Sequence, residues 1–240
     1  MGSCRFVPLM VVVSLVFCLS CASDEEKIQT YLNSGDSYFA QEEYRSAEIE
    51  FKNAIQINPN LVEAHLKLGE TYLKLGNARG AFSEFSTAAK IAPDNLDTQL
   101  KLATFLFLGT QMAQAREKVT LILSQEPENV EALMLQAGLD EREEQFEKAL
   151  ATYENVLQID GSRVGAYLGV ARIQLRLGRR DAAEATLVNA GQAAPEALEP
   201  VMALFRFYAA QGQLQKADTV IQKAIADHPD NAGLLIVQAN

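Results

Sequence analysis

The strongest constraint on this chain is one interval of 34 residues, which recurs from residue 28 to residue 231 without an insertion or deletion. Small residues keep this spacing at Ala47, Ala81, Ala115, Ala149, Ala183 and Ala217. Large apolar residues keep it at Phe51, Phe85, Val119, Tyr153, Leu187 and Ile221. Self-similarity at a fixed period of this length is typical of repeat architectures, in which each repeat is one supersecondary unit. We therefore expect residues 28–231 to form six copies of one unit.

The unit is predicted to consist of two amphipathic helices. In the stretch SAEIEFKNAIQI, residues 46–57, apolar residues recur mostly at helical spacing. Gly76, Gly178 and Gly212 are expected to end the first helix of their repeats, because a left-handed cap favours glycine. Gly69 lies inside a predicted helix, where glycine costs about 1 kcal/mol relative to alanine. We interpret Gly69 as a place where a neighbouring helix packs too closely for a side chain.

The period and the residue types resemble the tetratricopeptide repeat, whose pattern is W-x₂-L-G-x₂-Y, then A-x₃-F, then P. The second repeat has the most complete match, with Leu68, Gly69, Tyr72, Ala81, Phe85, Ala88 and Pro93. The fourth repeat departs most, with Gln136 and Asp140 where the pattern has Leu and Tyr. The resemblance implies an all-α fold, a right-handed superhelical solenoid of antiparallel helix pairs. Such pairs stack because one pair cannot bury its apolar face alone.

The domain boundaries follow from the period. We expect a signal peptide at residues 1–20, a linker at 21–27, and six repeats at 28–61, 62–95, 96–129, 130–163, 164–197 and 198–231. Residues 232–240 are interpreted as the start of a seventh repeat. Terminal repeats usually carry a polar capping face, and this ending is a short apolar stub. The chain is therefore expected to be a fragment of a longer array or to lack a following domain, with a frayed end as the alternative.

The first 20 residues are typical of a secretory signal. A single arginine precedes an apolar run at residues 6–19, which is shorter than the roughly 20 residues of a membrane span. The letters CLSC resemble a bacterial lipobox, with Ser20 before Cys21, so Cys21 is the predicted lipidation site. Ordinary cleavage after Ala22 and an uncleaved anchor are the alternatives. The residues after the cysteine are uncharged, which favours an outer-membrane lipoprotein on the periplasmic face.

Composition and motifs exclude several classes of function. The net charge of −10 argues against a nucleic-acid binder, because phosphate binding needs a concentrated basic surface. His65 and His228 lie in different repeats without a ligand cluster, so no metal or other cofactor is expected. No P-loop, dinucleotide or nucleophile-elbow motif occurs, so we expect neither an enzyme nor a small-molecule substrate. The acidic run at residues 140–148 is interpreted as a solvated helix end and turn.

In the tetratricopeptide family the first helices line a concave groove, which the resemblance implies here. One groove position is aliphatic in every repeat, at Leu32, Leu66, Leu100, Met134, Leu168 and Met202. An aromatic residue and charged residues complete the predicted surface, at Asp36, Glu70, Phe107, Arg172, Arg176 and Arg206. Packing between adjacent first helices is the alternative explanation of the aliphatic positions, although exposed apolar patches tend to mark binding sites. The charges predict that a bound peptide places its basic part at the early repeats and its acidic part at repeats 5 and 6.

The expected function is a non-catalytic protein–protein interaction scaffold of the bacterial cell envelope. It would bind a peptide or partner protein in the groove and the membrane through a lipid anchor. The layout resembles tetratricopeptide lipoproteins that accompany outer-membrane and exopolysaccharide assembly systems, including those of exosortase (PEP-CTERM) type. The alternative is the periplasmic arm of a larger enzyme or export pore whose active domain lies beyond residue 240.

Overall fold

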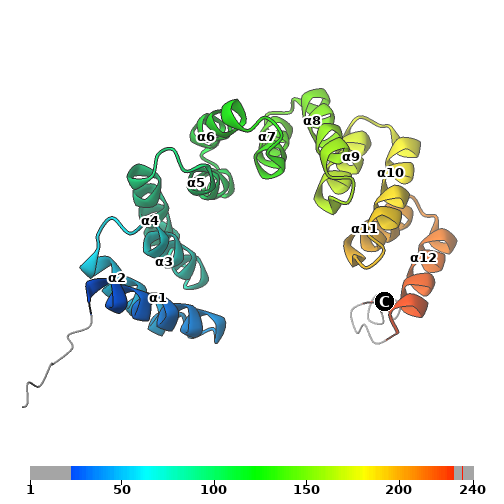
Figure 1. The fold of residues 1–240 in the computed structure, drawn as a ribbon. Helices are drawn as coiled ribbons and strands as arrows, with labels where there is room; N and C mark the ends of the chain where they lie inside the picture. The colour runs from blue at the N-terminus through cyan, green and yellow to red at the C-terminus, as the bar shows by residue number, and fades with distance from the viewer. Residues whose placement is uncertain (1–22, 230–233, 235–240) are drawn as a thin grey trace, which may run out of the picture.

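A computed structural model of the chain describes residues 23–229 and residue 234. In this part the chain forms helices joined by short turns, with no strand, which confirms the predicted all-α class (Figure 1). The helices are α1 (Asp24–Ala40), α2 (Tyr44–Ile57), α3 (Val62–Lys74), α4 (Ala78–Ile91), α5 (Leu96–Leu108), α6 (Met112–Gln125), α7 (Val130–Arg142), α8 (Phe146–Ile159), α9 (Val164–Arg176), α10 (Arg180–Ala193), α11 (Leu198–Ala210) and α12 (Leu214–Asp227).

From α2 onward, equivalent helices begin 34 residues apart, and the predicted repeat boundaries coincide with the first residues of α3, α5, α7, α9 and α11. The predicted linker at 21–27 needs correction, because α1 already begins at Asp24. Ser23 caps this helix with a capping box, in which the Glu26 backbone N–H donates to Ser23 Oγ at 3.1 Å. The predicted signal peptide, Cys21 and most of the predicted seventh repeat lie outside the described residues.

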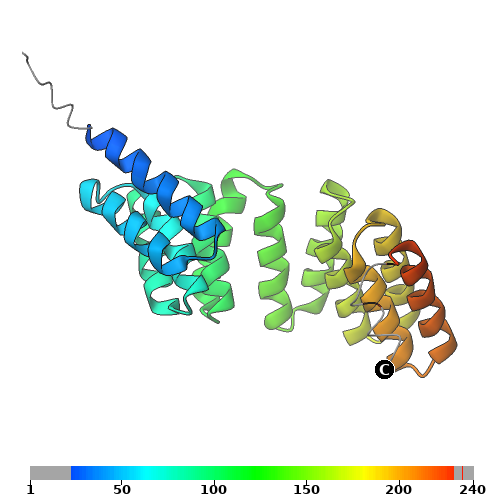
Figure 2. The same ribbon diagram turned by 90° about the horizontal axis from the view of Figure 1, so that it is seen from below.

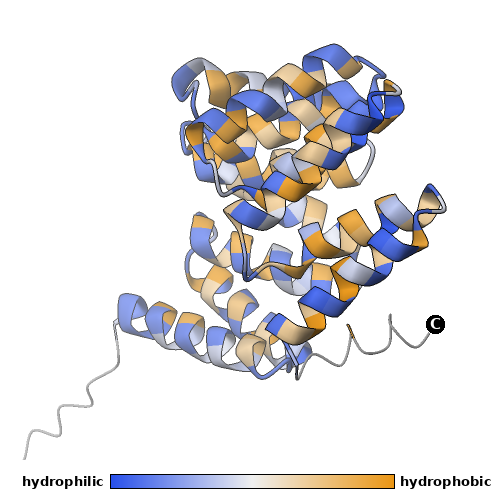
Figure 3. Ribbon diagram, turned by 90° about the vertical axis from the view of Figure 1, so that its right-hand side faces the viewer, coloured by the Kyte–Doolittle hydropathy of each residue, from blue (hydrophilic) through white to orange (hydrophobic). Residues whose placement is uncertain are grey.

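The helices stack in chain order into an arch, with α1 and α12 at its opposite ends (Figure 1). The first helices of the repeats lie on the inner side of the arch and the second helices on the outer side (Figure 1). Seen from below, the helices follow one another in chain order from the blue to the red end (Figure 2). Apolar and polar residues alternate along each helix, as expected for helices that bury one face (Figure 3). Each helix thus packs mainly against its neighbours in sequence, as in a one-dimensional solenoid.

Small residues sit where the helices meet most closely. Ala47, Ala81 and their equivalents up to residue 183 have 0% of their surface exposed. At Gly69, an added Cβ would lie 2.6 Å from Cε1 of Phe85, closer than real Cβ atoms come to any neighbour. Gly35 meets Phe51 in the same way. The interpretation of Gly69 as a site of close helix approach is confirmed, since α4 supplies the ring.

The turn between the two helices of each repeat uses one left-handed residue. Gly76, Gly178 and Gly212 have φ of 72°, 75° and 71°, as predicted. The equivalent residues of the other repeats are Glu42, Thr110 and Glu144, with φ of 62°, 61° and 59°. The left-handed conformation is therefore a property of the shared turn, and three repeats adopt it with a residue that has a Cβ.

The junctions between repeats are tied by a recurring side-chain hydrogen bond. A first-helix residue donates to the carbonyl oxygen six positions earlier, where the preceding second helix has ended. His65 Nε2 lies 2.9 Å from the Pro59 oxygen, and Gln99 Nε2 lies 3.1 Å from the Pro93 oxygen. The Tyr167 hydroxyl makes the same bond at 3.2 Å to Gly161. Three different side chains thus bind equivalent backbone carbonyls at the junctions between repeats.

Candidate binding groove

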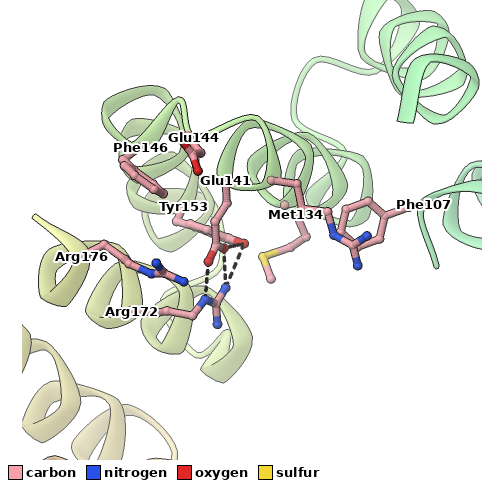
Figure 4. Close-up of a pocket in the computed structure, with 10 residues that line it drawn as sticks. Phe107, Met134, Glu141, Glu144, Phe146, Tyr153, Arg172 and Arg176 are labelled. Carbon is pink, nitrogen blue, oxygen red and sulfur yellow. Dashed lines mark hydrogen bonds and ion pairs between the residues drawn. The ribbon is translucent and has the colours of Figure 1, made fainter. Parts of the chain in front are cut away.

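Among the described residues, the inner side of the arch carries two pockets that share Met134. The first has a volume of about 610 Å³ and lies over α3, α5 and α7; it is here called the aliphatic pocket. Its apolar lining includes Leu73, Leu100, Phe105, Leu108, Met134 and Leu135. The second, here called the arginine pocket, has a volume of about 600 Å³ and is lined by Phe107, Met134, Gly138, Glu141, Arg142, Glu144, Phe146, Tyr153, Arg172 and Arg176 (Figure 4). Because Met134 borders both, the two pockets are adjacent, and together they are here called the groove.

The aliphatic pocket presents apolar side chains to solvent. Leu108 is 67% exposed and Leu73 is 44% exposed, although leucine is usually buried. Leu100 and Met134 are half-buried. Both line the aliphatic pocket, and Met134 also packs against core residues of α7, α8 and α9.

Ion pairs between successive first helices cancel part of the charge predicted for the early repeats. Lys67 Nζ donates to both carboxylate oxygens of Asp36, at 2.7 and 2.8 Å. Lys101 pairs with Glu70 across the next junction. Both pairs join residues 31 positions apart, so the same geometry recurs. Asp97, on the wall of the aliphatic pocket, makes no ion pair within the described part of the chain.

In the arginine pocket, Arg172 binds Glu141 and Tyr153. Its Nε and Nη2 donate to the two oxygens of Glu141 at 2.6 Å each, and Nη2 lies 3.4 Å from the Tyr153 hydroxyl (Figure 4). The hydrogen bonds to Glu141 raise the pKa of Arg172. Burial, with the charge of Glu141, raises the pKa of Tyr153 to about 12, so this phenol stays protonated at neutral pH. A two-pronged pair of this kind holds the guanidinium in one orientation.

Two other arginines border the same pocket without a carboxylate partner in the described residues, Arg142 and Arg176. The Arg142 guanidinium carbon lies 4.4 Å from the centroid of the Phe107 ring, in a cation–π contact. The pocket therefore keeps cationic groups that are available to a ligand.

A third pocket of about 950 Å³ lies over α9 and α11. Leu168, Met202 and Arg206 line it, together with Glu196 and Glu199. Nine of the twelve predicted groove residues thus border one of the three pockets, namely Glu70, Leu100, Phe107, Met134, Leu168, Arg172, Arg176, Met202 and Arg206.

The other three predicted groove residues have a different environment. Leu32 is corrected to a core residue, since only 3% of its surface is exposed and it packs with Phe51 and Leu68. Leu66 packs against the core between α4 and α5. Asp36 is exposed but is occupied by Lys67. Interhelical packing is therefore the correct explanation of the aliphatic position in the first two repeats.

The acidic run at 140–148, interpreted from sequence as solvated, is largely used in contacts between repeats. Asp140 is only 3% exposed, and its Oδ1 lies 2.9 Å from Nη2 of Arg116 in the preceding helix. Glu141 binds Arg172, as described above, and Glu147 pairs with Arg179 at 2.6 Å. Opposite charges 31 or 32 positions apart were the signal in the sequence that could have predicted the pairs of Glu141 and Glu147, whereas Asp140 and Arg116 are 24 positions apart.

The described residues contain no group of three or more histidine, cysteine, aspartate or glutamate side chains placed to hold a metal ion. In the same part of the chain, every helix is too short or too polar to cross a bilayer. The groove of apolar side chains and arginines is thus the most distinctive surface of the described structure.

Comparison with known proteins identifies related sequences and folds. A family model described as "Cytochrome c-type biogenesis protein H TPR domain" matches residues 25–163, and one described as "Tetratricopeptide repeat" matches residues 142–196. The sequence matches no curated protein.

Solved structures with similar folds include PilW, described as a widely conserved type IV pilus biogenesis factor. It is 20% identical, the match covers 89% of this chain and 97% of PilW, and the TM-score is 0.71. The PilF protein of Pseudomonas aeruginosa is 15% identical, with 90% and 98% covered and a TM-score of 0.67. MamA of Desulfovibrio magneticus RS-1 is 16% identical, with 71% and 97% covered and a TM-score of 0.64. At these identities the likeness concerns the fold alone.

Proposed function

The chain belongs to the tetratricopeptide-repeat family, since the model for the TPR domain of cytochrome c-type biogenesis protein H covers more than half of it, and on that premise we propose a non-catalytic scaffold that binds a segment of a partner protein in the inner groove. Solenoids of this kind use their extended concave surfaces for binding. The observation that carries the proposal is the pair of adjacent pockets that share Met134, with Leu108 two-thirds exposed on the wall of the aliphatic pocket.

A crosslinking experiment with a matched control tests this function. A photo-reactive amino acid replaces Leu108 in the groove or, as the control, Leu214, which is 68% exposed on α12 and borders none of the three groove pockets. After irradiation of cells, the probe at position 108 is expected to yield a discrete protein adduct that the probe at position 214 does not. Equal labelling at the two positions would place the binding surface elsewhere.

The proposed setting is the bacterial envelope, with the protein held at the periplasmic face of the outer membrane by acyl chains on Cys21. The lipobox-like sequence that ends at Cys21 supports this part of the proposal. Two or more acyl chains suffice for stable anchoring, whereas a single chain is marginal. Cells fed a fatty-acid analogue should label the wild-type protein, and label retained by Cys21→Ala would refute the anchor. Assembly of exopolysaccharide or outer-membrane components is the process we propose for it.

The family match favours a second candidate, a role in cytochrome c biogenesis, because the model that covers residues 25–163 describes a domain of that system. Cells that lack the gene would then lose covalently bound haem from their c-type cytochromes, which haem staining of denaturing gels measures. Unchanged haem staining together with a groove adduct would favour the envelope-assembly candidate.

A further inference from the structure

The arginine pocket contains a positive charge that the fold itself does not use. Of the arginines in the described residues, Arg116, Arg163, Arg172 and Arg179 pair with carboxylates. Arg142 and Arg176 do not, although both border the same pocket. They are 34 residues apart, each the last residue of its first helix, so they occupy equivalent places in adjacent repeats.

The local charge balance is opposite in sign to that of the whole chain. Three arginines and two glutamates, Glu141 and Glu144, line the pocket, which leaves an excess of one positive charge. The chain has a net charge of −10. Arg172 and Glu141 neutralise each other directly, so the excess lies with Arg142 and Arg176. An acidic ligand is therefore attracted to this pocket and repelled by most of the remaining surface.

Apolar side chains border the arginine pocket beside these arginines. Phe107 lies against Arg142, Met134 joins the two pockets, and Phe146 closes the arginine pocket near Glu144 (Figure 4). Stacking on an aromatic ring orients a guanidinium, which is weakly hydrated and binds carboxylates with two parallel hydrogen bonds. A ligand that fits both pockets therefore combines a carboxylate with neighbouring aliphatic side chains.

We propose that the groove binds a partner segment whose aspartate or glutamate side chains pair with Arg142 and Arg176 and follow or precede aliphatic residues that fill the aliphatic pocket. This inference rests on the proposed function and specifies the chemistry of its partner. Of the three arginines that the sequence predicted for the acidic part of a partner, this inference keeps Arg176, replaces Arg172, which Glu141 binds, with Arg142, and omits Arg206, which borders the third pocket.

Synthetic peptides with fluorescent labels test the proposal on the full chain by fluorescence anisotropy. The first probe has three leucines followed by two glutamates and a C-terminal amide, which removes the terminal carboxylate. The second has glutamines in place of the glutamates, and the third is the second with a free C-terminal carboxylate. We expect the glutamate peptide to bind about tenfold more tightly than the glutamine amide, as for a charge-assisted hydrogen bond. Its advantage should shrink as salt is raised.

Matched variants assign the effect to the pocket. Arg142→Gln and Arg176→Gln should each remove most of the glutamate advantage, whereas Arg79→Gln, at an exposed arginine of α4, should leave it intact. Both pocket arginines are exposed, so circular dichroism should show unchanged helix content. Leu108→Asp should weaken binding of all three peptides, because it alters the aliphatic pocket.

The outcomes separate the inference from the function it rests on. Peptides that bind equally well with glutamate and glutamine, yet depend on Leu108, would overturn the acid-binding site and leave the groove function standing. Tighter binding by the free-carboxylate peptide than by the glutamate amide would assign the arginines to a chain terminus instead and overturn the side-chain proposal. Failure of every peptide to bind would also overturn it, while the crosslinking experiment independently judges the groove.

Discussion

Repeats 2 and 3, residues 62–95 and 96–129, are neighbours in the arch and solve three structural problems with different residues. Both bury an alanine completely at the helix contact, Ala81 and Ala115. They differ at the facing first-helix residue, at the left-handed turn and at the side chain that binds the junction carbonyl, where repeat 2 has Gly69, Gly76 and His65 and repeat 3 has Ala103, Thr110 and Gln99. The shared alanine keeps the backbone of the two repeats alike, and the three differing residues determine how stable each repeat is.

The largest expected effect comes from the helix contact. Gly69→Ala should reduce the free energy of unfolding by about 2 kcal/mol, because overpacking against Phe85 exceeds the gain in helix propensity. In repeat 3 the equivalent pair, Ala103 and Val119, shares one core cluster, so alanine is accommodated where the partner is smaller.

A double-mutant cycle sharpens this difference. The double variant Gly69→Ala with Phe85→Val has the residues of repeat 3 at this contact. Its free energy of unfolding should exceed the value expected from adding the two single effects by about 0.5–3 kcal/mol. Urea denaturation of the four proteins measures the coupling. Additive effects would mean that the two positions are not matched in size, and the comparison of the repeats would lose its physical basis.

The turn gives a smaller effect, with opposite signs in the two repeats. Gly76→Thr should lower the free energy of unfolding by about 1 kcal/mol, because a residue with a Cβ is strained at φ of 72°. This strain exceeds the gain from replacing glycine, which loses more entropy on folding. Thr110→Gly should stabilise the protein by a similar amount, because threonine is β-branched and adopts φ of 61°. Thermal unfolding followed by circular dichroism measures both changes. Shifts of the same sign would show that strain at this turn does not decide stability.

The smallest effect concerns pH. His65 lies between two acceptors, with Nδ1 2.6 Å from Glu84 Oε2 and Nε2 2.9 Å from the Pro59 oxygen, so only the protonated ring donates to both. The hydrogen bond to Glu84, opposed by burial, raises the pKa of His65 above its usual 6.5. A group with a raised folded-state pKa stabilises the protein fully below its unfolded pKa, and this stabilisation is lost as pH rises through the folded value.

Wild-type protein should therefore have a lower melting temperature at about pH 9 than at about pH 6, by a margin that His65→Gln reduces. This substitution copies Gln99, which binds the equivalent carbonyl without titrating. In the reverse control, Gln99→His should not acquire the same dependence, because the residue 34 positions after Glu84 is Lys118. A wild-type pH difference that persists in His65→Gln would assign it to other groups.

The sequence was sufficient for the fold because the fold is periodic. Alanines at a strict spacing identify the helix contact, and Gly69 could be explained from the cost of glycine in a helix before its partner Phe85 was known. The left-handed conformation of Thr110 was missed because sequence preference identifies this conformation through glycine. The shared turn imposes it on Thr110, and threonine itself gives no sign of it in the sequence.

The groove was harder to predict than the fold, because it depends on how one repeat is rotated against the next. Glu70 borders the aliphatic pocket but was taken as available to a ligand, since its pairing with Lys101 arises only across the junction between repeats. Arg142 was hidden in a run of acidic residues, where its contact with Phe107 of the preceding repeat could not be read. Position along a helix predicts the face of a side chain, whereas its partners depend on the neighbouring repeat.

The ion pairs between successive first helices have a mechanical consequence. Lys67–Asp36, Lys101–Glu70 and Arg172–Glu141 each bridge 31 positions on the inner side of the arch. Small angles at the junctions add along the chain, so the ends of the arch move like the tips of a lever when one junction opens. Exposed ion pairs weaken as the screening length falls from about 10 Å at 0.1 M salt to about 3 Å at 1 M. We therefore expect the separation of the two ends of the arch to vary more at high salt than at low salt.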